Sequence, residues 1–298
     1  MVYFFNLAFH YDLDTTVVVF SKTFFMQKFK VAAIQLTSTE DIEQNLLRAF
    51  EICKDAAQAG AIVIGLPENF AFFGRESVKS ENYEIIYRQS IEFLEKTSRE
   101  LEIFLLGGGY PSKSSDAKKY YNTASIFSPK GEMLYTYHKM HLFDSNPGDG
   151  VEYKESNTVQ AGEQLPMPVQ LGDLGKFSSL VCYDLRFPEL FRHLSKLGTE
   201  VIFLPAAFTK LTGEAHWEVL LRSRAIENLC YVVAPAQTGV HDSSGKRKTY
   251  GHSMIIDPWG KIVESIGDEI GYAMAEIDIT KIYEARSKIP ALSHRRLG

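Results

Sequence analysis

The chain has 298 residues, of which 45% are hydrophobic and 23% charged, an ordinary composition for a globular protein with one large core. Its formal net charge of −5 excludes the basic footprint of a nucleic-acid-binding protein. No run of about twenty apolar residues occurs, so we expect no membrane span and no membrane partner. Three cysteines do not make a disulfide framework, and they predict a reducing, cytoplasmic compartment.

The N-terminal stretch differs from the rest of the chain. Its apolar clusters are interrupted by Asp12 and Asp14, and it has neither the basic start nor the cleavage site of a signal peptide. We interpret residues 1–27 as a non-core extension and residues 28–298 as a single domain. A start codon assigned too early, upstream of Met26, would explain residues 1–25. N-terminal sequencing of the protein from its own cell would test this.

The first half of the domain alternates strands and helices. An apolar strand is predicted over 29–36, and Ser38 with Asp41 resembles a capping box that opens a helix ending at Gly60. A second strand over 61–65 completes a β-α-β unit, which predicts a parallel strand pair. The other elements expected here are a helix over 83–100 and strands over 103–107, 120–127 and 133–137.

The second half is richer in hairpins. Its expected elements are strands over 169–171, 177–182, 201–204, 230–235, 250–256, 261–265 and 272–277, and helices over 188–197, 214–228 and 279–286. Many strands with few amphipathic helices predict two sheets packed face to face with helices outside. The predicted fold is therefore α/β, a four-layer α-β-β-α sandwich. The segment 144–162 is rich in Gly, Asp, Glu and Asn, and we interpret it as a functional loop.

Cys182 lies at a predicted strand-to-helix elbow. It ends the apolar run 177–181, and Pro188 suits the first turn of the helix that follows. Ligands bind at this edge of open α/β sheets, and a nearby helix N-terminus favours a thiolate. The alternative for any cysteine is a buried, inert residue, and we assign that role to Cys53 and Cys230.

Two further reactive side chains follow strand ends, and together with Cys182 they form a coherent chemical set. Glu68 can take the thiol proton if burial raises its pKa. Lys139 and the backbone N–H of Tyr183 can stabilise the oxyanion of a tetrahedral intermediate. The alternatives are a solvated carboxylate at Glu68 and a surface cation at Lys139.

Two histidines flank Lys139 and are candidate metal ligands. His138 and His141 are three residues apart and have no obvious third ligand, so the metal signal is weak. We expect no metal and no cofactor.

Three separated motifs resemble the nitrilase, or carbon–nitrogen hydrolase, superfamily over roughly residues 28–296. The resemblance implies an α-β-β-α sandwich, a Glu68–Lys139–Cys182 triad and subunits that pair through helices, hence a homodimer or higher homo-oligomer. It also implies that Glu155, rather than Glu152, positions Lys139 and the substrate amide. The motifs are Leu-Pro-Glu-Asn at 66–69, His-Lys-Met-His-Leu-Phe-Asp at 138–144 and Cys-Tyr-Asp-Leu-Arg-Phe-Pro-Glu at 182–189.

Downstream segments resemble the deaminated glutathione amidase branch of this superfamily. The resemblance implies hydrolysis of the amide of keto-substituted glutathione to 2-oxoglutarate and cysteinylglycine, a metabolite repair reaction. The departures are the N-terminal extension and Pro235, and neither is part of the triad. The segments are 206–209, 212–218, 224–228, 236–239, 250–254 and 257–260.

A small-molecule substrate that carries carboxylates needs a cation to bind it. Arg186 is the predicted cation, although a salt bridge to Asp184 or Glu189 is the structural alternative. We expect Phe208 to form an apolar wall. The other expected substrate-binding residues are Tyr183 and Thr212, with His216 as a weaker candidate.

Two other functions fit parts of the pattern. An ω-amidase acting on 2-oxoglutaramate, a nitrilase or a carbamoylase would use the same triad on another substrate. A non-catalytic scaffold is the alternative outside enzymes, and the complete triad argues against it. Comparing rates on deaminated glutathione and 2-oxoglutaramate would separate the enzymes, and thiol titration would distinguish the scaffold.

Overall fold

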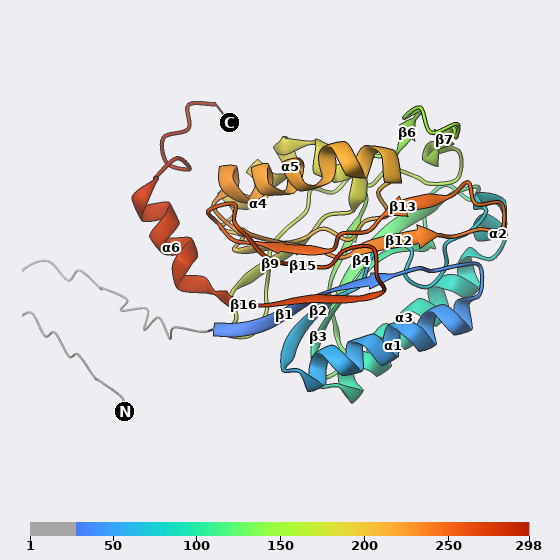
Figure 1. Cartoon of the computed structure of the whole chain (residues 1–298), viewed down its shortest axis with the longest axis horizontal. Helices are drawn as coiled ribbons and strands as arrows, with labels where there is room; N and C mark the ends of the chain where they lie inside the picture. Colours follow the sequence, from blue (N-terminus) through green and yellow to red (C-terminus); the bar gives the residue numbers. More distant parts are fainter. Residues whose placement is uncertain (1–27, 298) are drawn as a thin grey trace, which may run out of the picture.

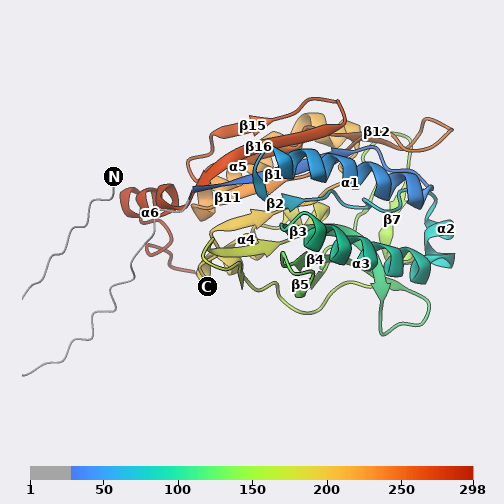
Figure 2. The ribbon, with the colours of Figure 1, turned by 90° about the horizontal axis from the view of Figure 1, so that it is seen from below.

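The computed structural model describes residues 28–297, and in it two β-sheets pack face to face between two pairs of helices (Figure 1). Helices α1 (Ile42–Gln58) and α3 (Tyr83–Glu100) lie side by side on the first sheet (Figure 2). Helices α4 (Pro188–Lys196) and α5 (Lys210–Asn228) cover the second. This confirms the predicted four-layer α-β-β-α sandwich.

The first sheet has eight strands in the order β13-β12-β1-β2-β3-β4-β5, with β16 antiparallel to β1. Strand β1 pairs in parallel with β2, as the β-α-β pattern predicted, and the end of β1 also pairs in parallel with the start of β12. The strands are β1 (Lys28–Leu36), β2 (Ala61–Gly65), β3 (Phe104–Lys113), β4 (Tyr120–Phe127), β5 (Met133–His138), β12 (Ala236–Val240), β13 (Lys248–Tyr250) and β16 (Gly271–Asp278).

The second sheet has six strands in the order β15-β14-β11-β10-β9-β8. They are β8 (Val169–Gln170), β9 (Lys176–Ser179), β10 (Val201–Phe203), β11 (Tyr231–Ala234), β14 (Met254–Ile256) and β15 (Ile262–Ser265). The smaller elements are α2 (Glu76–Glu81), α6 (Ile279–Lys288), the β6 (Asp144–Ser145) and β7 (Tyr153–Lys154) pair, and the 3-10 turns η1 (Glu155–Asn157) and η2 (Cys182–Arg186).

The strands are apolar on both faces because both faces are buried. In β1, Ile34 packs against the helices of the first sheet, whereas Val31 and Ala33 face the second sheet. In β10, Ile202 faces the outer helices and Phe203 the space between the sheets. This period-2 division gives three apolar layers and explains why these strands do not alternate with polar residues.

Several local predictions were wrong. The predicted capping box does not form, because Ser38 is buried and donates to the carbonyl of Phe70, whereas Asp41 alone caps α1 by accepting from the N–H of Gln44. The strand predicted over 250–256 is broken at Gly251 and His252, whose φ angles of 74° and 58° lie in the left-handed region.

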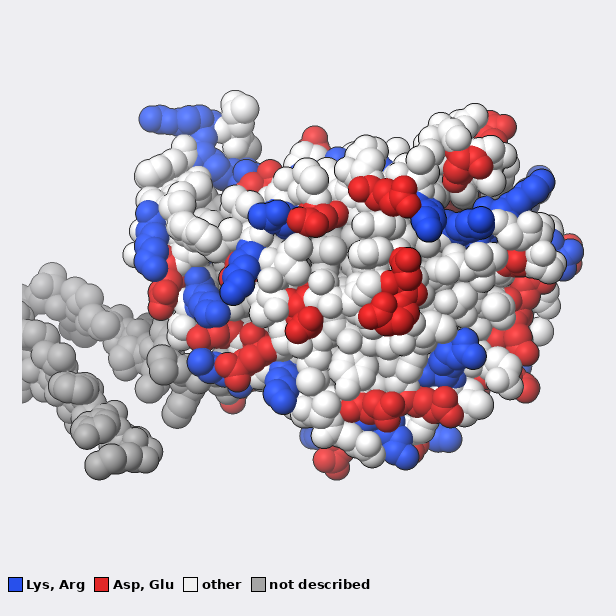
Figure 3. Space-filling view, viewed as in Figure 1, with Lys and Arg blue, Asp and Glu red and all other residues white. Residues whose placement is uncertain are grey.

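Three further boundaries differ from those predicted. Strand β12 was not predicted, α5 begins at Lys210, and β3 continues past its glycines to Lys113. The predicted N-terminal extension, 1–27, lies outside the described residues. Within the described chain, no helix has the length and apolarity to cross a bilayer. Acidic and basic side chains are interspersed on the face shown in Figure 3.

Candidate active site

The structure brings Glu68, Lys139 and Cys182 into one buried cluster. Their exposed fractions are 4%, 2% and 9%. The ammonium of Lys139 lies 3.1 Å from Oε1 of Glu68, and the carboxylate of Glu68 is hydrogen-bonded to the thiol of Cys182. Three side chains that follow β2, β5 and β9 therefore meet where the two sheets face each other.

Glu68 is held by donors from both sheets. Its Oε1 accepts from the Asn122 amide at 2.8 Å, and its Oε2 accepts from the backbone N–H of Ala207 at 3.1 Å. A side chain at Gly109, which has φ +64°, would bring a Cβ within 2.3 Å of Glu68 Cγ. The glycine is needed because β3 passes directly against Glu68.

Lys139 is bound on its other side by Glu155. Its Nζ lies 3.0 and 2.9 Å from the two carboxylate oxygens of Glu155, which also accept from Asn122 and from the N–H of Phe143. Glu152, the other glutamate in this loop, is exposed, and its Oε1 lies 3.9 Å from Nζ of Lys154 rather than beside Lys139. The loop over 144–162 forms part of the cavity wall.

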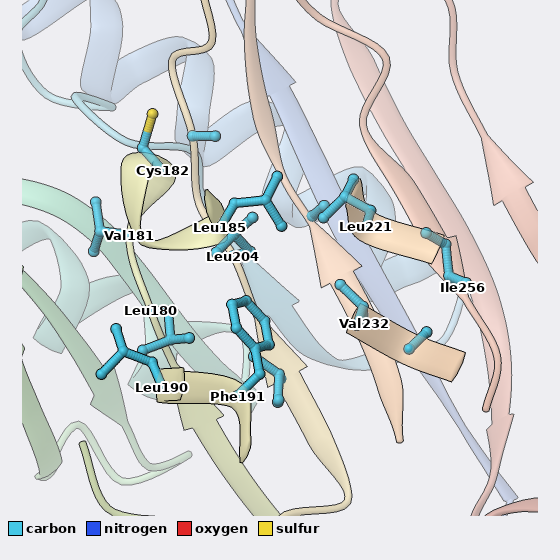
Figure 4. Close-up of a cluster of buried hydrophobic side chains, with 14 of the residues drawn as sticks. Leu180, Val181, Cys182, Leu185, Leu190, Phe191, Leu204, Leu221, Val232 and Ile256 are labelled. Atoms are coloured by element: carbon cyan, nitrogen blue, oxygen red, sulfur yellow. The ribbon is translucent and has the colours of Figure 1, made fainter. Parts of the chain in front are cut away.

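Cys182 begins the short 3-10 turn η2 rather than an α-helix. Its φ of 46° is left-handed, its N–H donates to the carbonyl of Pro205 at 2.9 Å, and the rest of η2 separates it from α4. Figure 4 shows its sulfur pointing away from the apolar side chains packed beneath the turn, among them Leu185 and Phe191. The predicted elbow is present, but the predicted helix N-terminus is not at the thiol.

The electrostatics of the cluster differ from two expectations. Burial raises the pKa of the Cys182 thiol well above its usual range, and the charge of Glu68 raises it further. Burial also opposes the ionisation of Glu68, but the nearby charge of Lys139 holds the pKa of Glu68 below its usual value. The sequence favoured a thiolate and made the role of Glu68 as a base depend on a raised pKa. Instead, burial and the charge of Glu68 keep Cys182 a thiol, and Lys139 keeps Glu68 ionised despite its burial.

Lys139 stays charged for a related reason. Burial disfavours its ammonium, but the carboxylates of Glu155 and Glu68 raise its pKa well above the usual value. The resting cluster is therefore a thiol, two carboxylates and an ammonium. A base and a fixed cation beside a nucleophile are the groups that an acyl transfer needs.

Asp184 connects the cysteine turn to the lysine strand. It is fully buried, and it accepts hydrogen bonds from the Val181 N–H at 3.1 Å, the Tyr137 hydroxyl at 2.8 Å and the N–H and Nδ1 of His141 at 3.1 and 2.8 Å. Neither this role of Asp184 nor that of Asn122 was predicted from the sequence. A polar residue inside an apolar strand was the only available signal for Asn122.

The cluster opens into a cavity of about 310 Å³, the size of a small-molecule site. The half-buried guanidinium of Arg186 lies 5.2 Å from the ring centre of Phe208 and donates to Nδ1 of His216 at 3.3 Å. Within 28–297 it has no carboxylate partner, so the structural alternative, a salt bridge to Asp184 or Glu189, is not present there. All four predicted substrate-binding residues line the cavity: Tyr183, Arg186, Phe208 and Thr212.

The two histidines beside Lys139 have other partners. His138 shares a hydrogen bond with Thr123 at 3.0 Å, and His141 bonds to Asp184 and stacks on Phe187. Among the described residues no group of three or more His, Cys, Asp or Glu side chains is arranged to hold a metal ion.

Comparisons with known proteins point in one direction. A family model described as carbon-nitrogen hydrolase matches residues 30–287. A deaminated glutathione amidase from Synechocystis is 46% identical over 271 residues, which cover 91% of this chain and 99% of that protein.

Two solved structures share the fold. The C. elegans NitFhit protein matches with a TM-score of 0.85 at 38% identity, covering 91% of this chain and 66% of that one. Saccharomyces cerevisiae Nit3, described as a member of branch 10 of the nitrilase superfamily, matches with a TM-score of 0.79 at 32% identity, covering 91% and 97%.

Proposed function

The chain belongs to the carbon-nitrogen hydrolase family, and on that premise we propose that it hydrolyses the amide bond of deaminated glutathione to 2-oxoglutarate and cysteinylglycine. The observation that carries the proposal is the buried contact of Glu68 with Lys139 and Cys182 at the end of a small cavity. The name of the relative that is 46% identical supports this choice of amide.

The first chemical step is attack of Cys182 sulfur on the amide carbonyl. The resting thiol is protonated, so Glu68 takes its proton as the carbon–sulfur bond forms. The carbonyl oxygen gains negative charge, which the ammonium of Lys139 and the backbone N–H of Tyr183 stabilise. Glu68 then returns the proton to the leaving nitrogen. The carbon–nitrogen bond breaks, and the acyl group remains on Cys182 as a thioester.

The second step consumes one water. Glu68 accepts a proton from the water as its oxygen attacks the thioester carbonyl, and the thiol of Cys182 leaves with that proton. Glu155 holds the ammonium of Lys139 through both steps by two short hydrogen bonds. The sum of the steps is one amide and one water converted to one acid and one amine.

Arg186 is the proposed partner of the substrate's keto-acid carboxylate. It is four residues from the nucleophile, lines the cavity and has no acidic partner within the described chain. A guanidinium suits a planar carboxylate, and Phe208 and Thr212 complete that side of the wall.

Steady-state assays on two amides test the proposal. We expect release of 2-oxoglutarate and cysteinylglycine from deaminated glutathione, with a higher kcat/KM than for ammonia release from 2-oxoglutaramate. The reverse preference would make the chain an ω-amidase. No turnover of either would reject both substrates.

The proposal also covers the oligomeric state of the protein and its location in the cell. Three exposed apolar side chains lie on α5 and on the turn packed against it, namely Val219, Ile226 and Trp259 at 65%, 48% and 58% exposure. Such a patch suits pairing with a second copy, so we expect a homodimer or higher homo-oligomer. The cytoplasmic location is proposed separately, from the three free cysteines. Light scattering should give at least twice the 33.7 kDa chain mass, and a monomeric mass would contradict the pairing.

A further inference from the structure

Lys79 on α2 is a buried cation with unused hydrogen-bonding capacity. It is 6% exposed and lines the same cavity as Cys182. Its ammonium donates to Oδ1 of Asn69 at 2.7 Å, and it forms no ion pair with any residue in 28–297. An ammonium has three donors, and among the described residues only one donor of Lys79 has a hydrogen-bond partner.

Glu76, one turn before Lys79 on α2, has hydrogen-bonded partners of its own. Its Oε2 accepts from the hydroxyl of Tyr120 at 3.1 Å, and its Oε1 accepts from Arg247 at 3.4 Å. Burial opposes the ionisation of Glu76, and the charges of Lys79 and Arg247 lower its pKa, but within 28–297 no hydrogen bond or ion pair joins Lys79 to Glu76, so donors of the ammonium remain available.

Lys79 and Arg186 reach the cavity from opposite halves of the sandwich. Lys79 follows β2 of the eight-stranded sheet, and Arg186 follows β9 of the six-stranded sheet. Their neighbours differ in chemical role as well. Arg186 shares the η2 turn with Cys182, whereas Lys79 binds Asn69, the residue directly after Glu68.

We propose that Lys79 binds a carboxylate on the leaving group, so that the site selects amides with a carboxylate on each side of the scissile bond. This rests on the proposed function. The acyl half stays on Cys182, beside Arg186. The amine half departs after protonation by Glu68, and Lys79 lies next to Glu68 through Asn69.

This assignment makes a distinction between the two candidate substrates. Deaminated glutathione has a carboxylate at the glycine end of its leaving group. 2-Oxoglutaramate releases ammonia and has no carboxylate there. The charge on Lys79 therefore favours the first substrate over the second, while Arg186 serves both.

Three amides test the assignment: deaminated glutathione, its glycinamide analogue, which lacks only the terminal charge, and 2-oxoglutaramate. The wild-type enzyme should prefer the acid to the glycinamide by about 10- to 100-fold in kcat/KM, the range for a hydrogen bond to a charged group. Lys79→Met should bring that ratio close to one. Lys79→Gln, which keeps a donor for Asn69, should do the same, and Lys79→Arg should restore part of the preference.

Lys54→Met, which removes an exposed lysine on α1, is the matched control and should keep the wild-type ratio. If Lys79→Met and Lys79→Gln slow the acid and the glycinamide equally, Lys79 only supports Asn69 and the assignment is wrong. A wild-type enzyme that hydrolyses both equally would also overturn the assignment, yet leave the proposed function intact. Turnover of 2-oxoglutaramate alone would remove the proposed function and this inference with it.

Discussion

The turn at Cys182 and the core around Cys230 both bury a thiol, but they surround it differently. Cys230 lies among apolar side chains beneath α5, where burial raises its pKa to about 12. Burial also raises the pKa of Cys182, but this thiol touches the carboxylate of Glu68 and lines a cavity. Burial and pKa direction therefore do not separate a nucleophile from a core cysteine here. A neighbouring base and space for a substrate do.

The largest test of this comparison removes each thiol in turn. Cys182→Ala should lower kcat on deaminated glutathione on the order of 10⁴-fold or more, because no other group forms the thioester. Cys230→Ala is the matched control at an equally buried thiol, and it should keep kcat within about twofold while losing some stability to the cavity it leaves. Both rates come from the same steady-state assay.

Appreciable turnover by Cys182→Ala would remove the thiol from the mechanism. Thermal melting separates loss of chemistry from loss of fold. Cys182→Ala should melt close to the wild-type temperature, since its side chain lies at the cavity rather than within packed core.

The pH dependence of kcat/KM sharpens the comparison. Because the pKa of Glu68 is lowered, its carboxylate is in the basic form at all pH values above its ordinary value of 4.5. Because the pKa of Cys182 is raised, its thiol stays protonated well into the alkaline range. We therefore expect a flat profile from about pH 5.5 to 8, with an acid limb below 4.5 that comes from protonation of Glu68.

A mechanism that begins from a free thiolate gives a different profile. Its rate would rise about tenfold per pH unit through the neutral and alkaline range, because the pKa of the Cys182 thiol is raised. Observing that rise with deaminated glutathione would show that Glu68 does not take the proton during attack.

The parts of the site that local sequence signals mark could be predicted. The parts that depend on contacts between distant residues could not. Glu68, Lys139 and Cys182 were predictable as candidates because each follows a strand. Their meeting was less predictable, because β9 lies in a different sheet from β2 and β5. The directions of the Glu68 and Cys182 pKa shifts were not predictable, because they depend on which charges touch across two sheets.

Other residues gave no local signal. Nothing in the sequence around Lys79 distinguishes it from a lysine on an exposed helix. Its burial depends on a contact with Asn69, the residue after Glu68. Asp184 resembled a salt-bridge partner for Arg186, its neighbour in the chain, whereas its partners come from the strand and loop near Lys139. Strand β12 was missed because Pro235 and the short run after it resemble a turn more than a sheet edge.

Substitution of Asp184 has the smallest expected effect on kcat. It tests whether the hydrogen bonds around the Cys182 turn also distinguish this thiol from Cys230. Its carboxylate is surrounded by donors from Val181, Tyr137 and His141, so it positions the Cys182 turn without touching the substrate cavity. Asp184→Asn replaces one acceptor oxygen with a donor facing other donors. We expect a loss of about 2 kcal/mol in the free energy of unfolding, the cost of a hydrogen bond to a charged group.

We also expect about a tenfold lower kcat for Asp184→Asn with little change in KM, because a misplaced turn affects attack more than binding. Asp116→Asn, at an exposed loop, is the matched control and should change neither quantity. If Asp184→Asn lost stability while kcat stayed at the wild-type value, the geometry of the Cys182 turn would not depend on this hydrogen-bond set. The distinction from the Cys230 site would then rest on Glu68 and the cavity alone.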